Sequence, residues 1–444
     1  MSKTALGWTV AIGLVVGLVP LSPAPAFAQA APTFGADVAP ILQQRCQTCH
    51  RRGQMAPMSL VTYEEVRPWA RAIRTKVAER SMPPWHIDKT IGIQEFENDI
   101  SLSEAEIDTI VDWVDAGAPR GNPGDMPPPV EWPADDIWRL EARYGRPPDL
   151  IVTSPPWTQS AEGQDQWWQP VVETGLTEDR WATGIEIRPT IEARRVTHHS
   201  NVYLLQEEAP GDHVAAVDVT PRGSYFSEFA IGKIGDVFRE NTGKLLKAGA
   251  RFTFDNHYHS VGEEVVAQTD VGVWFYPRGF VPKYRVYGQA MGAQQSQQTM
   301  DLPPGKVTVH HAYIPLPAPA RLENYQPHMH IRGKSMSMEA ILPDGRVETL
   351  SHVENFDFNW HVNYVYTDDS APVLPAGTVV HITAWHDNTA ANRNNPDPRQ
   401  WVGWGQRSYD DMYHAHVNVT YLTQEDYEQI VAEREARRRT NDQQ

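Results

Sequence analysis

The sequence has very little cysteine and no extended basic segment. Cys46 and Cys49 are the only cysteines among 444 residues, which excludes the framework of several disulfides that is common in small exported domains. The formal net charge is −17, and Lys and Arg gather only in EREARRRT near the C-terminal end. Because nucleic-acid binding needs a basic surface that displaces counterions from phosphate, we expect no nucleic-acid partner.

Long apolar runs are also missing, except near the N-terminal end. The stretch MSKTALGWTVAIGLVVGLVPLSPAPAFAQA combines a short positive region at Lys3, an apolar segment to Val19 and the small-residue pattern Ala26-Phe27-Ala28. This pattern predicts a cleavable secretory signal over residues 1–28. The alternative, an uncleaved anchor, fits less well because the apolar segment is short and ends in proline. We therefore expect an exported protein, periplasmic in a bacterium or secreted, with no membrane span in the mature chain.

Aromatic residues, proline and glycine are abundant. The chain has 15 Trp, 16 Tyr, 12 Phe, 36 Pro and 30 Gly. This composition suits β-rich, loop-rich globular domains better than helical bundles. The length corresponds to about two to three domains of ordinary size.

The two cysteines belong to the stretch RCQTCHRRG, which contains the C-x-x-C-H pattern of covalent c-type haem attachment. On one helical turn Cys46 and Cys49 face the same side, and His50 is placed to ligate the iron. A thioredoxin-like pair is the alternative, but the surrounding βαβ pattern is absent. Apolar spacing in ADVAPILQQRC and a Ser103–Glu106 capping box before an amphipathic stretch resemble a class I cytochrome c, which we assign to residues 29–120.

The sixth iron ligand is less clearly marked. Met82, in RSMPPW, is our choice because the prolines hold an extended loop that can present a thioether to the iron. Met55, Met58 and His86 are the rivals. Residues 121–150 are rich in proline and are expected to be a stiff linker or a wrapping segment.

Beyond residue 150, short alternating segments recur between turn signals, as expected for β-sandwich or jelly-roll domains. We expect two such domains, residues 151–305 and 306–426, followed by a polar tail, residues 427–444. The expected strands lie in TGIEIRP, RVTHHSNVYLL, RFTFDNHYHS, VGVWFYP, KVTVHHAYIPL, SMSMEAILPDGRVETL, TVVHITAW and HAHVNVTYL.

Fifteen of the 17 histidines fall in this region, and several are paired. An x-His alternation places two imidazoles on one strand face, where they can begin a metal site. Adjacent histidines such as His198 and His199 need a bend or a strand end to serve one site. Imidazoles suit Zn, Cu, Fe and Ni, whereas a thioether such as that of Met412 selects Cu(I) over zinc.

The ordered set THHSNVYLL, FDNHYHS, QPHMHIRGKSM and SYDDMY resembles the copper type II, ascorbate-dependent monooxygenases, the family of peptidylglycine α-hydroxylating and dopamine β-monooxygenases. The resemblance covers about residues 150–425 and implies two packed jelly rolls with one copper each. It implies one copper at His198, His199 and His257, which supplies an electron. It implies a second, oxygen-activating copper whose catalytic ligands are His328, His330 and Met412.

This sequence departs from the family in two respects. It lacks the disulfides of the animal enzymes, because both cysteines belong to the haem motif. Five further histidines have no role in the family pattern. His414 and His416 share a strand face with Met412 and could compete as ligands, although we favour a supporting role. The others are His259, His310 and His311.

Together these features predict a small all-α haem domain followed by a mainly-β region that hydroxylates a C–H bond of a small substrate with O2. Two copper ions and one covalent haem c are the expected cofactors. A periplasmic cytochrome, a quinol-linked carrier or an ascorbate-like reductant would supply electrons through the haem. A non-catalytic haem and copper electron-transfer protein is the first alternative, and a zinc hydrolase is the second.

Overall fold

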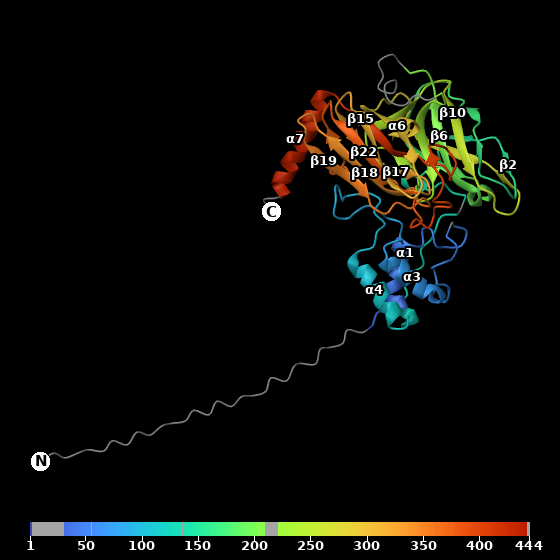
Figure 1. Ribbon diagram of the computed structural model, residues 1–444, viewed down its shortest axis with the longest axis vertical. Coiled ribbons are helices and arrows are strands. Elements are labelled where there is room, and N and C mark those ends of the chain that lie inside the picture. The colour runs from blue at the N-terminus through green and yellow to red at the C-terminus, as the bar shows by residue number, and fades with distance from the viewer. Residues whose placement is uncertain (2–30, 55, 135, 209–220, 442–444) are drawn as a thin grey trace.

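The computed structural model describes residue 1 and residues 31–54, 56–134, 136–208 and 221–441. Apart from Met1, the expected signal peptide lies outside the described residues, as does Met55. The described chain is mostly β-sheet with few helices, as expected for a β-rich multidomain chain. Figure 1 shows α1 (Ala39–Arg45), α3 (Ala70–Ala78) and α4 (Glu104–Asp115) gathered to one side of the sheets.

Each of these helices buries an apolar face, and α4 begins at a capped first turn. The N–H of Glu106 donates to the Ser103 hydroxyl, and the Glu106 carboxylate accepts from the N–H of Ser103, so the predicted capping box is confirmed. Trp113 in α4 is fully buried in the core that the helices share. The remaining helical segments are η1 (Phe34–Val38), α2 (Tyr63–Val66), η2 (Arg67–Trp69), η3 (Pro123–Asp125), α5 (Glu141–Tyr144), η4 (Glu192–Arg195), α6 (Ala293–Thr299) and α7 (Gln424–Asn441).

The first half of the β region encloses one hydrophobic core between two sheet walls. One wall is the sheet β3-β10-β6-β7, with β4 also on β10, and the other contains β1, β12, β5 and β9. The strands are β1 (Leu150–Thr153), β2 (Trp157–Gln159), β3 (Gln166–Trp168), β4 (Val171–Glu173), β5 (Arg180–Pro189), β6 (Thr197–Leu205), β7 (Ser224–Ala230), β8 (Asp236–Val237), β9 (Thr242–Leu246), β10 (Arg251–Tyr258), β11 (Val265–Ala267) and β12 (Thr269–Phe275).

The second half encloses its own core, with the sheet β15-β22-β18-β19 as one wall. Strands β24, β16, β17, β20 and β21 contribute to the other. The strands are β13 (Tyr284–Met291), β14 (Asp301–Leu302), β15 (Val307–Pro315), β16 (Ala320–Leu322), β17 (Asn324–Met329), β18 (Gly333–Ile341), β19 (Val347–Val353), β20 (Tyr364–Val365), β21 (Val373–Leu374), β22 (Val379–Asp387), β23 (Val402–Gly403) and β24 (Tyr413–Tyr421).

The two halves share a continuous sheet. Strand β13 pairs with β24 from Val286↔Thr420 to Met291↔Ala415 and also touches β9 of the first half. Beyond β13, Met300 and Leu302 pack in the second core. Met291 already packs in this second core, before the expected boundary at residue 305.

The segment between α3 and α4 also departs from the expected division. Trp85, Ile87 and Phe96 belong to the second β core, and Ile87 and Phe96 form bridges with Val353 and Tyr366. The expected unit 29–120 is therefore interrupted by residues that pack on the β region. The sequence could not indicate this, because an isolated apolar residue in a loop does not identify its partner.

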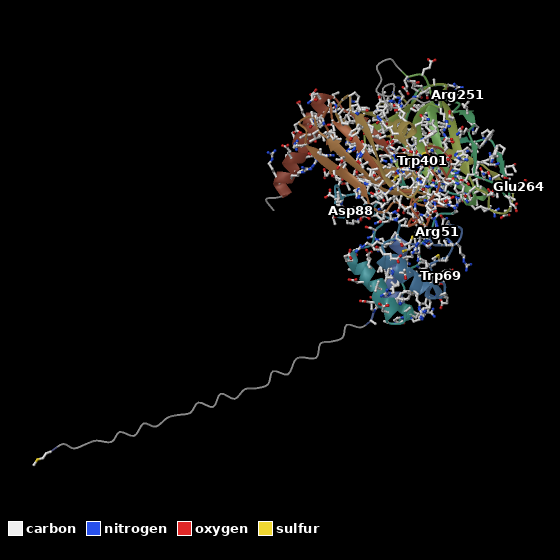
Figure 2. The ribbon with its side chains drawn as sticks, viewed as in Figure 1. Arg51, Trp69, Asp88, Arg251, Glu264 and Trp401 are labelled. Atoms are coloured by element: carbon white, nitrogen blue, oxygen red, sulfur yellow. The ribbon has the colours of Figure 1, made fainter. Side chains whose placement is uncertain are left out.

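The expected linker and tail both pack on the β region, and residues 121–150 take the wrapping arrangement, one of the two expected for them. Trp138 and Leu140 are buried beside Trp274, so residues 121–150 include a segment that wraps the sheet. Residues 424–441 form α7, and Arg434 donates to the carbonyl of Ala371. Among the described residues, no helix is long and apolar enough to cross a membrane. In Figure 2, Trp69 lies among the helices and Arg51 lies near their junction with the sheets.

Candidate metal centre

A β-bulge explains how two adjacent histidines can face one site. Strand β10 pairs with β6 so that His257 is opposite His199 and Tyr258 is opposite Thr197, which leaves His198 as an extra residue on β6. A bulge of this kind bends the strand and redirects a side chain. The imidazoles of His198, His199 and His257 consequently turn toward one another. The predicted need for a bend is confirmed.

The three rings present the same nitrogen to the centre of this first group. The Nδ1 of His199 lies 3.0 Å from Nδ1 of His198 and 3.4 Å from Nδ1 of His257. The Nε2 of His257 lies 2.9 Å from a carboxylate oxygen of Asp165. Trp167 stacks on His257, with ring centroids 4.5 Å apart. An outer carboxylate on one ring nitrogen fixes the other as the metal donor.

The second group forms where β17 pairs with β24. His328 is opposite His414, and Gln326 is opposite His416. The candidate ligand nitrogens of the three histidines lie within 4.8 Å of one another. The His328 and His414 rings are stacked at 4.5 Å, and the Nε2 atoms of His414 and His416 are 3.1 Å apart. The structure thus brings His414 and His416 to His328 as closely as a metal site requires.

His330 and Met412 lie at the same end of this strand pair. Continuing the β17–β24 register by one residue puts His330 opposite Met412. Both side chains line one cavity with His328, and the His330 ring centroid is 5.6 Å from that of His328. Buried Asp411 holds this end together, because its carboxylate accepts from the N–H groups of His330, Arg332 and Met412. The predicted ligands and their two rivals therefore share one face.

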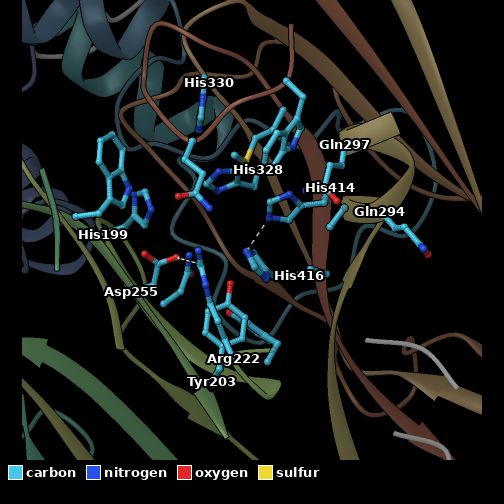
Figure 3. Close-up of a pocket in the computed structure, with 18 of the residues that line it drawn as sticks. His199, Tyr203, Arg222, Asp255, Gln294, Gln297, His328, His330, His414 and His416 are labelled. Carbon is cyan, nitrogen blue, oxygen red and sulfur yellow. Dashed lines mark hydrogen bonds and ion pairs between the residues drawn. The ribbon is translucent and has the colours of Figure 1, made fainter. Parts of the chain in front are cut away.

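Both histidine groups border a cavity of about 680 Å3. Figure 3 shows His199 beside His328, with His414 and His416 beyond His328. An ion pair between Arg222 and Asp255, 2.6 Å long, lies at the cavity wall. The other lining residues include the aromatic side chains Trp167, Tyr203, Tyr225 and Trp404 and the amides Asn201, Gln294, Gln297 and Gln406.

The imidazoles are buried and held neutral. Burial, reinforced by neighbouring imidazoles, lowers the pKa of His198 to about 2 and that of His414 to about 3. The pKa values of His199, His328 and His416 are lowered well below the ordinary value for the same reasons. Neutral imidazole is the form that binds metal. Within the described residues, the buried Nδ1 of His328 has no hydrogen-bond partner, which fits a metal-binding cluster.

The three other histidines that have no role in the family pattern occupy three different environments. The N–H of His259 donates to the carbonyl of Val196, beside the first group. His310 packs against His386, outside the cavity lining. His311 is exposed, and its Nδ1 lies 3.0 Å from Nε2 of His381. Sequence reasoning missed His361, which contacts both groups, because it is isolated between aromatic residues in FNWHVNY.

The C-x-x-C-H segment forms the tight turn that its spacing predicts. The N–H groups of Cys49 and His50 both donate to the carbonyl of Cys46. Burial raises the pKa of Cys46 to about 12, so the thiol is neutral. Nδ1 of His50 lies 3.3 Å from the carbonyl oxygen of Met58, which leaves Nε2 on the other side of the ring. Met82 is half buried after α3, with its N–H bonded to the carbonyl of Lys76.

Comparisons with known proteins do not assign a family. No family model matches the sequence, and no curated protein matches it. One solved structure, described as recombinant N-glycanase F (PNGase F), is 8% identical, covers 62% of this chain and 96% of its own, and has a TM-score of 0.28. PNGF-II is 8% identical over 60% of this chain and 61% of its own, with a TM-score of 0.25. TM-scores this low do not establish a shared fold.

Proposed function

We propose that this chain is an exported copper-dependent monooxygenase that hydroxylates a C–H bond of a small substrate with O2. The observation that carries the proposal is the meeting of two three-histidine groups at one cavity, which Met412 also lines. The family resemblance of the four histidine and methionine motifs supports it. A cavity of about 680 Å3 has the size of a small-molecule site.

The donors fit copper. Imidazole binds copper in either of its common oxidation states, and a thioether favours Cu(I). In this proposal His198, His199 and His257 hold one ion, and His328, His330 and Met412 hold the other, with His414 and His416 as competing ligands. Bound copper supplies the one-electron chemistry and the activation of O2.

The chain's own residues position the ligands and the substrate. Asp165 fixes the ring of His257, and Asp411 fixes the backbone of His330 and Met412. The Arg222–Asp255 pair offers one charge of each sign to orient a polar substrate in the cavity. Trp167 and Trp404 line the same cavity and would add apolar surface against a bound substrate.

Electrons would enter through a c-type haem bound to Cys46, Cys49 and His50, with Met82 as the proposed sixth ligand. The two free cysteines and the turn that joins them to His50 support this part. A periplasmic cytochrome, a quinol-linked carrier or an ascorbate-like reductant would then be the donor.

A zinc hydrolase is the second candidate, favoured by one observation. The group His328, His414 and His416 contains imidazoles only, which is a donor set that suits zinc with a bound water. It would leave Met412 and the haem motif without a role. Removal of metal followed by add-back distinguishes the two candidate functions. Zinc alone should restore a hydrolase, and copper alone should restore a monooxygenase.

The test is the content of copper, zinc and iron per polypeptide. The protein would be exported from a host that attaches haem c, loaded with copper and freed of loosely bound metal. We expect two coppers for each haem, falling to one in His328→Ala, with His311→Ala unchanged as the control because His311 is exposed. Retention of zinc instead of copper, or no bound metal, would contradict the proposal.

A further inference from the structure

His361 lies between the two histidine groups. Its ring centroid is 4.5 Å from that of His328, 5.9 Å from that of His198 and 6.1 Å from that of His199. The side chain is buried, and its Nε2 has no hydrogen-bond partner among the described residues. An unpaired buried polar atom destabilises the fold, so its presence in this position calls for a partner.

The backbone fixes His361 beside His328. Strand β20 pairs with β17 through Asn324↔Val365 and Tyr325↔Tyr364. Because the pairing is antiparallel, continuing it by three residues beyond Tyr325↔Tyr364 places His361 opposite His328. The side-chain amide of Gln326 donates to the carbonyl of His361 at 3.1 Å and holds this alignment beyond the strand.

The ring centroids of His361 and His328 are as close as those of two imidazoles on one ion, and His361 adjoins the three residues whose candidate ligand nitrogens lie within 4.8 Å of one another, His328, His414 and His416. With metal–nitrogen distances of about 2.0–2.1 Å, two imidazoles on one ion have ring centroids roughly 5 Å apart. His361 and His414 each lie 4.5 Å from His328, and His414 lies 4.6 Å from His416. Pairing with the nearby carboxylate of Glu228 does not explain the position of the His361 ring, because Glu228 contacts His416 instead.

We propose that His361 is a metal ligand and binds, through Nε2, the ion that His328 and His414 hold. The site would then have an imidazole donor set suited to copper, zinc or nickel that does not depend on Met412. This inference rests on the proposed metal binding by the cluster, but not on the proposed reaction with O2. It also gives a role to the single imidazole in the stretch FNWHVNY.

The test uses the full-length protein, stripped of copper and zinc. Zn(II) and, without oxygen, Cu(I) are titrated against a coloured competing chelator for the parent, His361→Gln and His311→Gln. Loss of an outer partner of a ligand weakens metal binding by about 10–100-fold, so loss of a direct ligand is expected to cost at least that for one equivalent. His311→Gln should match the parent.

A second variant separates ligation from packing. His361→Phe fills the same space beside Phe356 and Phe358 but offers no donor. If His361 is a ligand, the His361→Phe protein should fold. It should lack the rise in melting temperature that one equivalent of metal gives the parent. Parent-like metal affinity and the full metal-induced rise in both variants would overturn the assignment of His361. A parent that binds no metal would instead overturn the proposed function, and the assignment with it.

Discussion

His199 and His328 come from different halves of the β region, yet their ring centroids lie 5.8 Å apart with the ring planes at 86°. Each belongs to a different three-histidine group. The two groups are therefore neighbours rather than the opposite walls of a wide cleft. Ions bound in both groups would be close enough to influence each other.

The first prediction concerns that closeness. With Cu(II) in both groups, magnetic interaction between the two unpaired electrons should broaden the electron paramagnetic resonance signal or reduce its intensity below that of two isolated ions. His257→Ala, which removes a ligand from the first group only, should restore the signal of one isolated Cu(II). Two sharp, additive signals in the fully loaded parent would show that the groups do not approach as the structure has them.

Asp165 provides a second prediction. Its carboxylate lies 2.9 Å from Nε2 of His257 and accepts from the hydroxyl of Ser408 at 2.9 Å. Asp165→Ala removes the partner that fixes the ring, so the affinity of the first group for copper should fall by about 10–100-fold. Asp387→Ala, a change on β22 outside the cavity lining, is the control. The measurement is competition with a copper chelator, and unchanged affinity would contradict the assigned role.

The third prediction is that acid destabilises the metal-free protein. Folding lowers the pKa of six clustered histidines below the ordinary 6.5, to about 3 for His361. The unfolded chain then binds more protons below pH 6.5, so this stability is complete above that pH and is lost as the pH falls. The loss deepens as the pH falls further below 6.5. The six are His198, His199, His328, His361, His414 and His416.

Thermal unfolding between pH 6.5 and 5 would measure this effect. The melting temperature of the metal-free parent should fall steeply across that interval, and His361→Phe should fall less because one titrating group is gone. Bound metal should flatten the dependence by competing with protons for the same nitrogens. A parent whose melting temperature is constant across the interval would contradict the burial of neutral imidazoles.

A substitution at Phe96 tests whether the segment between α3 and α4 folds with the β region. It is buried in the second β core and stacks on Tyr366, with centroids 5.4 Å apart. Phe96→Ala should lower the free energy of unfolding of the β region by about 3–5 kcal/mol. Trp113→Ala, in the helical core, is the matched change and should affect the helices instead. Near-ultraviolet circular dichroism and limited proteolysis would assign each loss to its region.

The haem motif gives the last prediction. Cys46→Ala combined with Cys49→Ala prevents thioether attachment, so a reduced cytochrome donor should reduce the coppers far more slowly than in the parent. Rapid mixing followed by the loss of Cu(II) absorption measures the rate. A small reductant such as ascorbate, added directly, is the control and should reduce both proteins alike. Equal rates with the cytochrome donor would mean that electrons bypass residues 46–50.

Much of the fold was predictable because its signals are local. Alternating polarity identified the strands that became β6, β10, β15, β22 and β24, and one capping box located the start of α4. The adjacent pair His198 and His199 required a bend, and a bulge provides it. Each of these features depends on residues within a few positions of one another, which is the range that a sequence pattern reports.

Features that depend on pairing between distant segments were not predictable. His361 gains its position from the alignment of β20 with β17, and Trp85 and Phe96 from packing on the second β core. The approach of His414 and His416 to His328 was only partly signalled. Their x-His alternation matches that of His328 and His330, but the pairing of β17 with β24 decides which of them meet.

The order of the chain has a consequence for how the centre is assembled. His328 meets His414 only after β24 has taken its place between β13 and β17. During synthesis, every residue from 328 to 414 must emerge before the second group exists, while the first group is complete at His257. A metal ion present while the chain folds would find the first set of ligands complete before the second, so the first site should fill first.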